Sequence, residues 1–442
     1  MKTAILSVGT EILFGQITNT NTVYLSQQLQ MLGYDVMYHY TVGDNPTRLK
    51  EMILDIFKEC DLILTTGGLG PTQDDLTKET VCEALNDKII EFPEQVEILK
   101  SHFEKRGHKM TENNMKQAYF PSRAHIFDNP KGTAPGFALE ENGKMVICMP
   151  GPPSEMKYMF ENRVRPFLAE KQDSVLFYRS IRTFGIGESK LETELLPLIE
   201  GQTDPTIATY AKMGESTFRI ASKRKTEAEA KAAVDEMLEK AEKIVGSFVY
   251  SIDDEELAVV TGKKLIEKKI SLACAESITG GSFAGALTQV AGISSVFRGG
   301  FVTYTNEMKE KVLGVSKDTL AKYTEYSGET AAEMAQGTFE KTGADICISV
   351  TGVAGPDGGT EKCPVGQSYI GISFKSDILK GKKGKEGGNN PFTIFSDHGV
   401  LLREEKDGRT MVVKEIQAFG RERNNIRNYT VLAMLSLINS ML

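Results

Sequence analysis

The stretch DLILTTGGLGPTQDDLTKETV, residues 61–81, indicates an α/β fold. It opens with an apolar run typical of a buried strand, passes through a glycine-rich turn, and continues into a helix-like segment. The apolar runs at 3–9 and 35–42 are followed in the same way by helix-like segments. Strands that alternate with helices predict a mainly parallel sheet that is covered on both faces.

The chain has three segments that differ in patterning. Its 442 residues are too many for one hydrophobic core, which indicates two or three domains. From 176 to 250 the order of elements becomes strand, helix, strand, strand, helix, which is typical of a small α+β module. We therefore predict the fold class α/β, with two α/β domains at 1–168 and 255–442 joined by an α+β module at 176–250.

The composition limits the partners and the compartment. The net charge of -8 argues against nucleic acid as a main partner, and the basic residues from Arg219 to Lys225 are interpreted as an edge strand protected by charge. No apolar run approaches the roughly 20 residues that span a bilayer. The N-terminus indicates a first strand, not a signal peptide. Six cysteines without a CxxC pair indicate reduced thiols, so we expect a cytoplasmic protein with no membrane partner.

The glycine-rich turn is a candidate phosphate site, because glycines let a ligand approach the backbone and a helix N-terminus favours an anion. Two adjacent carboxylates there could bind a divalent cation beside a phosphate, or one of them could merely cap the helix. In parallel sheets the carboxyl ends of the strands meet at one crevice. The predicted ligand-binding residues are Thr10, Glu11, Asp44, Thr66, Gly67, Gly68, Gly70 and Thr72, and the predicted metal ligands are Asp74 and Asp75.

A second candidate site begins at AESITGGSFAGAL, residues 275–287. Ser277 is either a nucleophile or a residue that caps the following helix. A nucleophile needs a base, and the only histidine in this domain is His398, so a lysine is the better candidate. Helical spacing directs Lys309 inward and Lys311 toward water. Lys309 could then lose its proton through burial, or it could simply extend along the helix surface.

Several other features of the C-terminal domain suggest a bound ligand. A long Gly/Pro loop at 349–366 follows a buried strand and is predicted to be functional. The start of the helix after Ser277 is a potential anion nest. The Gly/Lys-rich segment 379–390 is predicted to be a mobile loop between strands. The predicted substrate-binding residues are Thr279, Gly280, Gly281, Ser349, Thr351, Gly352, Arg423 and Arg427, the two arginines being alternatively a solvated charged turn.

Four N-terminal motifs, GTEILFGQITNTN, TTGGLGPTQDD, GTAPGF and MPGPPSEM, resemble the molybdopterin-binding-like domain of the competence/damage-inducible CinA family. The segment PTIATYAK resembles the KH-like module of the same family, so the resemblance covers nearly the whole chain. It implies an N-terminal three-layer sandwich that hydrolyses ADP-ribose to AMP and ribose 5-phosphate with a divalent metal, which would be Mg, Mn or Co. Binding of a molybdopterin-like cofactor without hydrolysis is the alternative.

The motifs AESITGG, RGGFVTYTNEMK, SVTGVAGPDGGTEKCPVG and RERNNIR resemble the CinA C-terminal domain, whose stand-alone relatives deamidate nicotinamide mononucleotide (NMN). The resemblance implies that Ser277 attacks the carboxamide, that Lys309 accepts its proton, and that Tyr304 relays the proton or holds the lysine. It implies no cofactor for this domain. Thr279 remains the alternative nucleophile.

The resemblance as a whole implies a bifunctional hydrolase of pyridine nucleotide salvage that forms a homodimer. Its partners would be the small nucleotides NMN and ADP-ribose. A competence-associated regulatory protein that binds nucleotides or molybdopterin without turnover is the alternative function.

Overall fold

The computed structural model describes the chain except residues 106, 108–109, 173, 383–389 and 419–421. The described residues divide into two compact units, one made of Met1–Phe177 with Ser222–Lys231 and the other of Tyr178–Ala221 with Ala232–Leu442. Most of the predicted loop 379–390 therefore lies outside the described residues. The α/β fold class is confirmed, since helices and sheets alternate in both units.

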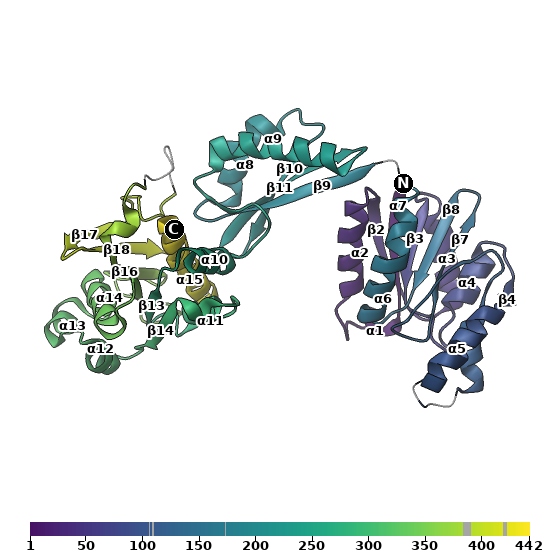
Figure 1. Ribbon diagram of the computed structural model, residues 1–442, viewed down its shortest axis with the longest axis horizontal. Coiled ribbons are helices and arrows are strands. Elements are labelled where there is room, and N and C mark those ends of the chain that lie inside the picture. The colour runs from purple at the N-terminus through teal and green to yellow at the C-terminus, as the bar shows by residue number, and fades with distance from the viewer. Residues whose placement is uncertain (106, 108–109, 173, 383–389, 419–421) are drawn as a thin grey trace. The chain divides into compact units, whose positions relative to one another are not determined.

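The first unit contains a six-stranded sheet of order β2-β1-β3-β8-β7-β6 (Figure 1). The four strands from β2 to β8 are parallel, and β7 and β6 are antiparallel. Its strands are β1 (Lys2–Val8), β2 (Asp35–Val42), β3 (Leu62–Thr66), β6 (His125–Phe127), β7 (Gly136–Glu141) and β8 (Lys144–Met149), and a separate pair is β4 (Ile89–Glu91) and β5 (Tyr119–Pro121).

Helices cover both faces of this sheet. Alternate residues of β1 point to opposite sides, so Leu6 packs with α3 and α4 while Ile5 packs with α2 and α6. The helices are α1 (Thr10–Leu13), α2 (Thr20–Met31), α3 (Pro46–Ile56), α4 (Thr77–Ala84), α5 (Pro93–Lys105), η1 (Glu112–Ala118), α6 (Pro153–Met159), η2 (Phe160–Val164) and α7 (Arg165–Ala169). The predicted coverage of both faces is confirmed.

The α+β module forms a four-stranded sheet of order β10-β11-β9-β12. Its elements are β9 (Val175–Thr183), α8 (Glu188–Ile199), β10 (Thr206–Lys212), β11 (Glu215–Arg224), α9 (Glu227–Val245) and β12 (Val249–Ser251). The structure adds β12 to the predicted order. The basic residues beginning at Arg219 lie on β11, between β10 and β9, so the interpretation of this segment as an edge strand is wrong.

The C-terminal domain contains a second six-stranded sheet, of order β14-β13-β15-β16-β18-β17, in which only β14, β13 and β15 are parallel. Its strands are β13 (Leu272–Glu276), β14 (Phe297–Val302), β15 (Ile346–Gly352), β16 (Gln367–Lys375), β17 (Val400–Lys406) and β18 (Arg409–Gln417). The antiparallel half follows the long Gly/Pro loop, which connects β15 to β16.

Helices also pack on both faces of this second sheet. They are α10 (Leu257–Lys268), α11 (Ser282–Thr288), η3 (Ile293–Ser295), α12 (Asn306–Leu313), α13 (Lys317–Tyr323), α14 (Gly328–Thr342), η4 (Ser376–Leu379) and α15 (Arg423–Met441). The main core lies between the sheet and the helices α10, α11 and α15, and α14 covers the opposite face.

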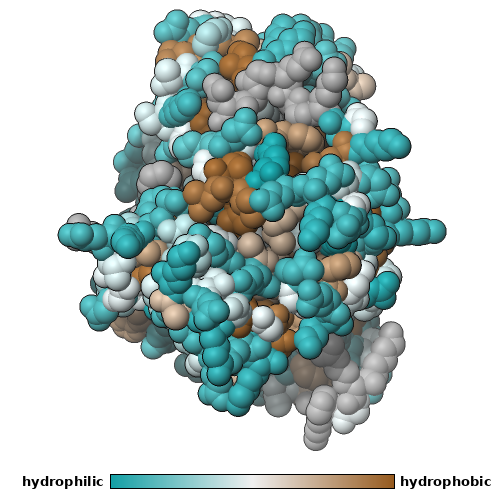
Figure 2. Space-filling view, turned by 90° about the vertical axis from the view of Figure 1, so that its left-hand side faces the viewer, coloured by the Kyte–Doolittle hydropathy of each residue, from teal (hydrophilic) through white to brown (hydrophobic). Residues whose placement is uncertain are grey.

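The mainly hydrophilic surface and the free thiols are those expected from the composition. On the face shown in Figure 2, hydrophobic residues form small patches between hydrophilic ones. All six cysteines are free, as predicted, and all six are buried. Within the residues that the structure describes, no helix has both the length and the apolar character that a bilayer crossing requires.

Candidate active sites

Ser277 lies directly after β13, a fully buried strand between β14 and β15. Its N–H donates to the carbonyl of Val350 at 3.0 Å, which extends the β13–β15 pairing by one residue. The side chain is 5% exposed. The N-cap residue of α11 is Gly281, which has a φ of 94° that favours glycine. Ser277 therefore does not cap the helix.

The carboxylate of Glu276 occupies the position at the start of α11 where the anion of a ligand could otherwise bind. It accepts hydrogen bonds from the N–H groups of Gly281 and Phe283 at 3.0 Å and of Ala284 at 2.9 Å. Because these donors are already used, they do not form the anion nest that the sequence suggests. The buried Glu276 instead fixes the turn that carries Ser277.

Lys309 reaches Ser277 from the first turns of α12. Thr305 caps this helix by accepting from the N–H of Met308 at 3.2 Å. The Nζ of Lys309 lies 3.0 Å from the Oγ of Ser277 and also donates to the carbonyl of Thr303 at 3.1 Å. Lys311 instead pairs with Glu307 on the surface. The predicted orientations of both lysines are confirmed.

Burial changes the acidity of the Lys309 ammonium. The side chain is 1% exposed, and its described contacts are the Ser277 hydroxyl and a backbone carbonyl, neither of which carries a negative charge. Burial lowers the pKa of Lys309 to about 8, although the charge of Glu325 acts in the opposite direction. With a pKa of about 8, roughly a tenth of the side chains carry the neutral amine at pH 7, which is the form that a general base requires.

Ser277 and Lys309 open into a cavity of about 260 Å³, which we call the Ser277 pocket. Tyr304 and Arg423 lie in its wall. The guanidinium of Arg423 donates to the Tyr304 hydroxyl at 2.9 Å and to the carbonyl of Gly355 at 2.6 Å. Arg423 thus ties the last helix both to the tyrosine and to the long Gly/Pro loop.

Of the other residues predicted to bind substrate in this domain, one lines the Ser277 pocket and the rest lie outside its lining. Gly352 lines the Ser277 pocket, whereas Ser349 and Thr351 are buried and donate to the carbonyls of Ala331 and Glu325. Four more residues lie outside its lining. Of these, Thr279 is 0% exposed, and Arg427 donates to its carbonyl at 2.7 Å. The predicted residues outside the lining are thus Ser349, Thr351, Thr279, Gly280, Gly281 and Arg427.

Several residues of the Ser277 site were not anticipated from the sequence, and three of them are charged or aromatic side chains of interest. Glu325 and Tyr326 line the pocket, and they come from the segment between α13 and α14, which has no motif of its own. Glu276 could have been found, because an acidic residue immediately before a glycine-rich helix start is suited to accept its free N–H groups.

The N-terminal pocket, with a volume of about 390 Å³, lies at the carboxyl ends of β1, β2 and β3. This is the crevice predicted for a parallel sheet. Thr10 and Thr72 lie outside its lining; Thr10 donates to the Asp44 carboxylate at 2.8 Å. The predicted residues in its lining are Glu11, Asp44, Thr66, Gly67, Gly68, Gly70, Asp74 and Asp75.

The glycine turn of this pocket has a strict steric requirement. Gly67 has a φ of 104°, and a Cβ there would lie 2.1 Å from the carbonyl oxygen of Val8. Gly68 has a φ of 67°, and a Cβ there would lie 2.1 Å from the hydroxyl of Thr77. The turn can therefore pass close to both β1 and α4 only with glycine at these positions.

Asp74 and Asp75 do not cap α4, whose N-cap residue is Leu76. The Thr72 hydroxyl lies within hydrogen-bond distance of both carboxylates, and the Thr72 N–H donates to Asp75 at 3.0 Å. The hydrogen bond from Thr72 lowers the pKa of Asp74. Lys116 donates to the backbone carbonyls of Thr72 and Asp75 and so holds the loop from below. Both carboxylates are thus held in place at the lining of the pocket.

The N-terminal pocket is acidic. Among the described residues that line it, none is a lysine, an arginine or a histidine. No cluster of three or more side chains suited to hold a metal occurs within the described part of the chain. A phosphate group in this pocket would therefore face carboxylates without a basic side chain to balance its charge. The acidic side chains in the lining are Glu11, Asp44, Asp74, Asp75 and Glu155.

Comparison with known proteins gives matches along nearly the whole chain. Three family models match in succession: the probable molybdopterin binding domain at 4–170, the damage-inducible protein CinA KH domain at 178–251, and the CinA C-terminal domain at 254–390. A competence-damage inducible protein of Acetivibrio thermocellus is 47% identical over 373 residues, covering 84% of this chain and 90% of the relative. A CinA-like protein of Dictyoglomus thermophilum is 42% identical over 401 residues, covering 91% and 98%.

Proposed function

The chain belongs to the CinA family, and from that premise we propose that its C-terminal domain hydrolyses NMN to nicotinate mononucleotide and ammonia. The observation that carries the proposal is the contact between Lys309 and Ser277, which lie 3.0 Å apart in the lining of a cavity. A lysine that is buried beside a serine hydroxyl without a carboxylate partner has the chemistry of a Ser/Lys amidohydrolase.

The reaction divides into two steps. The Oγ of Ser277 forms a bond to the carboxamide carbon while the neutral amine of Lys309 accepts the hydroxyl proton. The bond from that carbon to nitrogen then breaks, and Lys309 returns the proton to the leaving ammonia. Water attacks the resulting ester, which gives the carboxylate product and restores the serine hydroxyl.

The positions of the neighbouring side chains support Ser277 over Thr279 as the nucleophile. Thr279 is completely buried and lies outside the lining of the Ser277 pocket. Tyr304 lies in the pocket wall but has its described contact with Arg423, not with Lys309. We therefore propose that Tyr304 and Arg423 together bind the substrate and that Tyr304 takes no part in proton transfer. Arg423 would supply the positive charge that a nucleotide phosphate needs.

The test is ammonia release from NMN by the purified full-length chain. Ser277→Ala and Lys309→Ala should each lower the rate by at least about a thousandfold, because they remove the nucleophile and its base. Lys311→Ala is the matched control on the same helix and should retain the wild-type rate. Activity that survives Ser277→Ala and is lost in Thr279→Ala would transfer the nucleophile to Thr279. An inactive, folded wild type would overturn the proposal.

For the N-terminal domain we propose hydrolysis of ADP-ribose to AMP and ribose 5-phosphate with a divalent cation. The acidic lining of the N-terminal pocket supports this, because a pyrophosphate can approach five carboxylates only with cations between them. Oxygen donors of this kind fit Mg, Mn or Co. An ion that keeps several waters and takes phosphate oxygens needs only one or two carboxylates, which Asp74 and Asp75 would supply.

AMP formation from ADP-ribose with added Mg²⁺ or Mn²⁺ tests this second activity. Asp74→Asn and Asp75→Asn should each remove most of it, whereas Asp55→Asn, on the exposed surface of α3, should not. Both variants should release ammonia from NMN at the wild-type rate, which makes failure of one activity separable from failure of the other.

Two alternatives make different predictions. A regulatory protein that binds nucleotides without turnover would bind NMN equally well after Ser277→Ala and would release no ammonia in any form. An N-terminal domain that binds molybdopterin would bind a pterin tightly and leave ADP-ribose intact. The homodimer stays a prediction, which the molecular mass in solution would test.

A further inference from the structure

The Ser277 pocket holds charges of both signs that do not neutralise one another. The described contacts of the Arg423 guanidinium are with neutral groups, the Tyr304 hydroxyl and the Gly355 carbonyl. The Glu325 carboxylate accepts from the side-chain amide of Asn306 at 3.5 Å, which is also neutral. In the described part of the chain, no basic side chain forms an ion pair with either carboxylate of the lining. The charged residues of the lining are Lys309, Glu325, Asp357 and Arg423.

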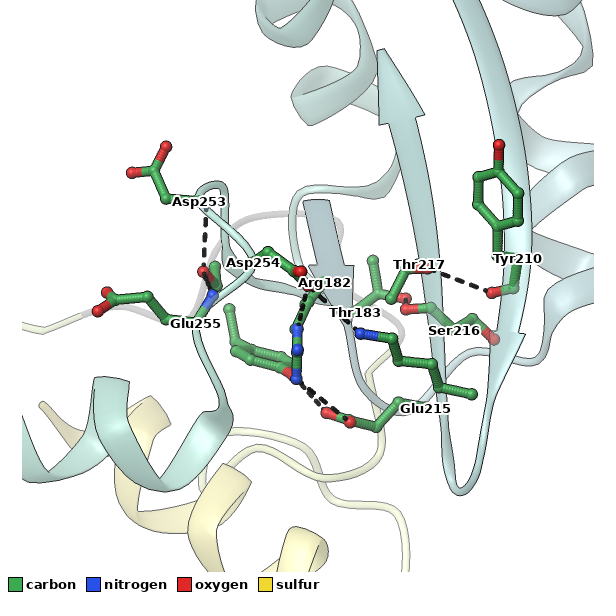
Figure 3. A network of polar contacts seen from close by, with 12 residues as sticks. Arg182, Thr183, Tyr210, Glu215, Ser216, Thr217, Asp253, Asp254 and Glu255 are labelled. Carbon is green, nitrogen blue, oxygen red and sulfur yellow. Dashed lines mark hydrogen bonds and ion pairs between the residues drawn. The ribbon is translucent and has the colours of Figure 1, made fainter. Parts of the chain in front are cut away.

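A charged cluster elsewhere in the second unit is paired within itself, as Figure 3 shows. Asp254 pairs with Arg182 at 2.6 Å and with Lys212 at 3.3 Å. The largely buried Glu215 lies 4.0 Å from Arg182. Glu325 is half-buried without such a partner, and a charge removed from water without its opposite costs free energy. Its carboxylate is therefore suited to a ligand that supplies positive charge.

Hydrogen bonds from two neighbouring elements hold the backbone around Glu325. The Thr351 hydroxyl, on β15, donates to the Glu325 carbonyl at 2.6 Å. The hydroxyls of Ser327 and Thr330, at the start of α14, donate to the Thr324 carbonyl at 3.1 and 2.8 Å. The Glu325 carboxylate is therefore presented from a fixed segment and not from a free loop.

The charge of Glu325 acts on the space beside the Ser277–Lys309 pair. Burial lowers the pKa of Lys309 to about 8, and the negative charge of Glu325 partly opposes this change. Burial also raises the pKa of Tyr326, which lines the same pocket; the charge of Glu325 adds to that rise and the charge of Arg423 opposes it. The carboxylate, the tyrosine ring and the guanidinium therefore surround one space.

The proposed substrate carries two charges that match this arrangement. The ring nitrogen of NMN is bonded to the ribose and is therefore positively charged, whereas the phosphate at the other end is negative. When the carboxamide reaches Ser277, the cationic ring comes close to Lys309, which is mostly protonated at pH 7. Like charges repel each other in a half-buried pocket. A carboxylate in that pocket offsets the repulsion, and an aromatic ring can bind a cation on its face.

We propose that Glu325 binds the pyridinium ring of the substrate, with Tyr326 beside it, and makes the Ser277 site selective for amides on a cationic ring. The inference rests on the proposed hydrolysis of NMN and adds the residue that selects the substrate by charge. The other carboxylate of the lining, Asp357, lies in the exposed stretch 356–362 of the Gly/Pro loop. Glu325 is therefore the carboxylate that the fold holds in place.

The test compares NMN with its reduced form, in which the ring is uncharged while the carboxamide, the ribose and the phosphate are the same. Binding is measured by titration calorimetry in the full-length Ser277→Ala chain, which lacks the proposed nucleophile, so that neither ligand is consumed. NMN should bind at least tenfold more tightly than reduced NMN. Glu325→Gln in this chain should weaken NMN binding at least tenfold and leave the binding of reduced NMN unchanged.

Two further variants distinguish an effect of charge from an effect on structure. Glu325→Asp keeps the charge and should retain most of the preference for NMN. Glu329→Gln, at an exposed position of α14 outside the pocket lining, should retain all of it.

Three outcomes would contradict the inference. A preference for NMN that Glu325→Gln leaves unchanged would overturn it, because Glu325 would then act on Lys309 alone. Equal binding of the two ligands, with ammonia release from NMN by the wild type, would overturn it and leave the proposed function standing. A wild type that releases no ammonia, together with no binding of NMN, would overturn both.

Discussion

The amine of Lys309 lies 3.0 Å from the hydroxyl of Ser277, although the two residues are 32 positions apart in the chain. Ser277 follows β13, an interior strand between β14 and β15, and Lys309 lies in α12, which packs on α14. Because each residue is held by a regular element, the pair is preorganised. The pair therefore needs no rearrangement before Lys309 can accept the Ser277 proton.

The rate of ammonia release should depend on the protonation of Lys309. Burial lowers the pKa of this side chain to about 8, and only the neutral amine can accept the serine proton. We therefore expect kcat/KM for NMN to rise with pH through about 8 and then level off. The measurement is a pH–rate profile of the wild type. A rate that is flat or that falls across this range would show that Lys309 is not the base.

Lys309 should also reduce the stability of the fold at neutral pH. Its pKa is lowered from 10.5 to about 8, so between these values the unfolded chain binds more protons and stability rises with pH. Lys309→Met should raise the free energy of unfolding by roughly 1–2 kcal/mol at neutral pH, and this gain should shrink as the pH rises from about 8 to 10.5. Urea unfolding at several pH values measures this. Lys311→Met, at an exposed site, should show no such dependence.

Glu276 should be essential for the turn that carries Ser277. Its carboxylate accepts from three backbone N–H groups at 2.9 to 3.0 Å. Glu276→Gln removes the charge and at least one acceptor site, so we expect a loss of about 2–3 kcal/mol in the free energy of unfolding and slower ammonia release. Thermal and urea unfolding provide the measurement, with Glu307→Gln, at an exposed site, as control. An unchanged stability would mean that the helix start needs no anion.

Tyr304 and Arg423 should act as one unit. The guanidinium donates to the phenol oxygen at 2.9 Å, and both side chains line the Ser277 pocket. Tyr304→Phe and Arg423→Lys should each reduce kcat/KM about tenfold, and the double variant should be little worse than the poorer single one. A double-mutant cycle on ammonia release measures the coupling. Simple additivity of the two effects would contradict this arrangement.

Removal of divalent cations should separate the two proposed activities. The acidic N-terminal pocket repels phosphates unless a cation lies between them, whereas the Ser277 site uses only side chains. EDTA should abolish AMP formation from ADP-ribose and leave ammonia release from NMN unchanged. Added Mg²⁺ or Mn²⁺ should restore the former. Hydrolysis of ADP-ribose that persists after chelation would contradict the role assigned to Asp74 and Asp75.

Local sequence patterns were sufficient for the architecture and for part of each site. Alternating strand and helix signals around residues 61–81 predicted sheets covered on both faces, because hydrophobic periodicity follows from the local geometry of each element. The same periodicity directed Lys309 inward and Lys311 outward. The glycines at 67 and 68 could be recognised because their backbone conformation excludes other residues.

The order of strands could not be read from such patterns. The basic segment at Arg219 was assigned to a sheet edge, but β11 lies between two strands, since pairing partners far apart in the chain decide which strand is central. The β10–β11 hairpin and the first turns of α15 line one cavity of the second unit for the same reason.

The sequence by itself determined the α/β elements, the family, and the serine, lysine and carboxylates around which both sites are built. Only the tertiary structure decided which groups remain available for chemistry. Glu276 occupies the N–H groups of α11, and Thr279 is buried away from the pocket. The physical reason is that a polar group is satisfied by whichever partner packing brings within about 3 Å, and those partners are set by contacts over long sequence separations.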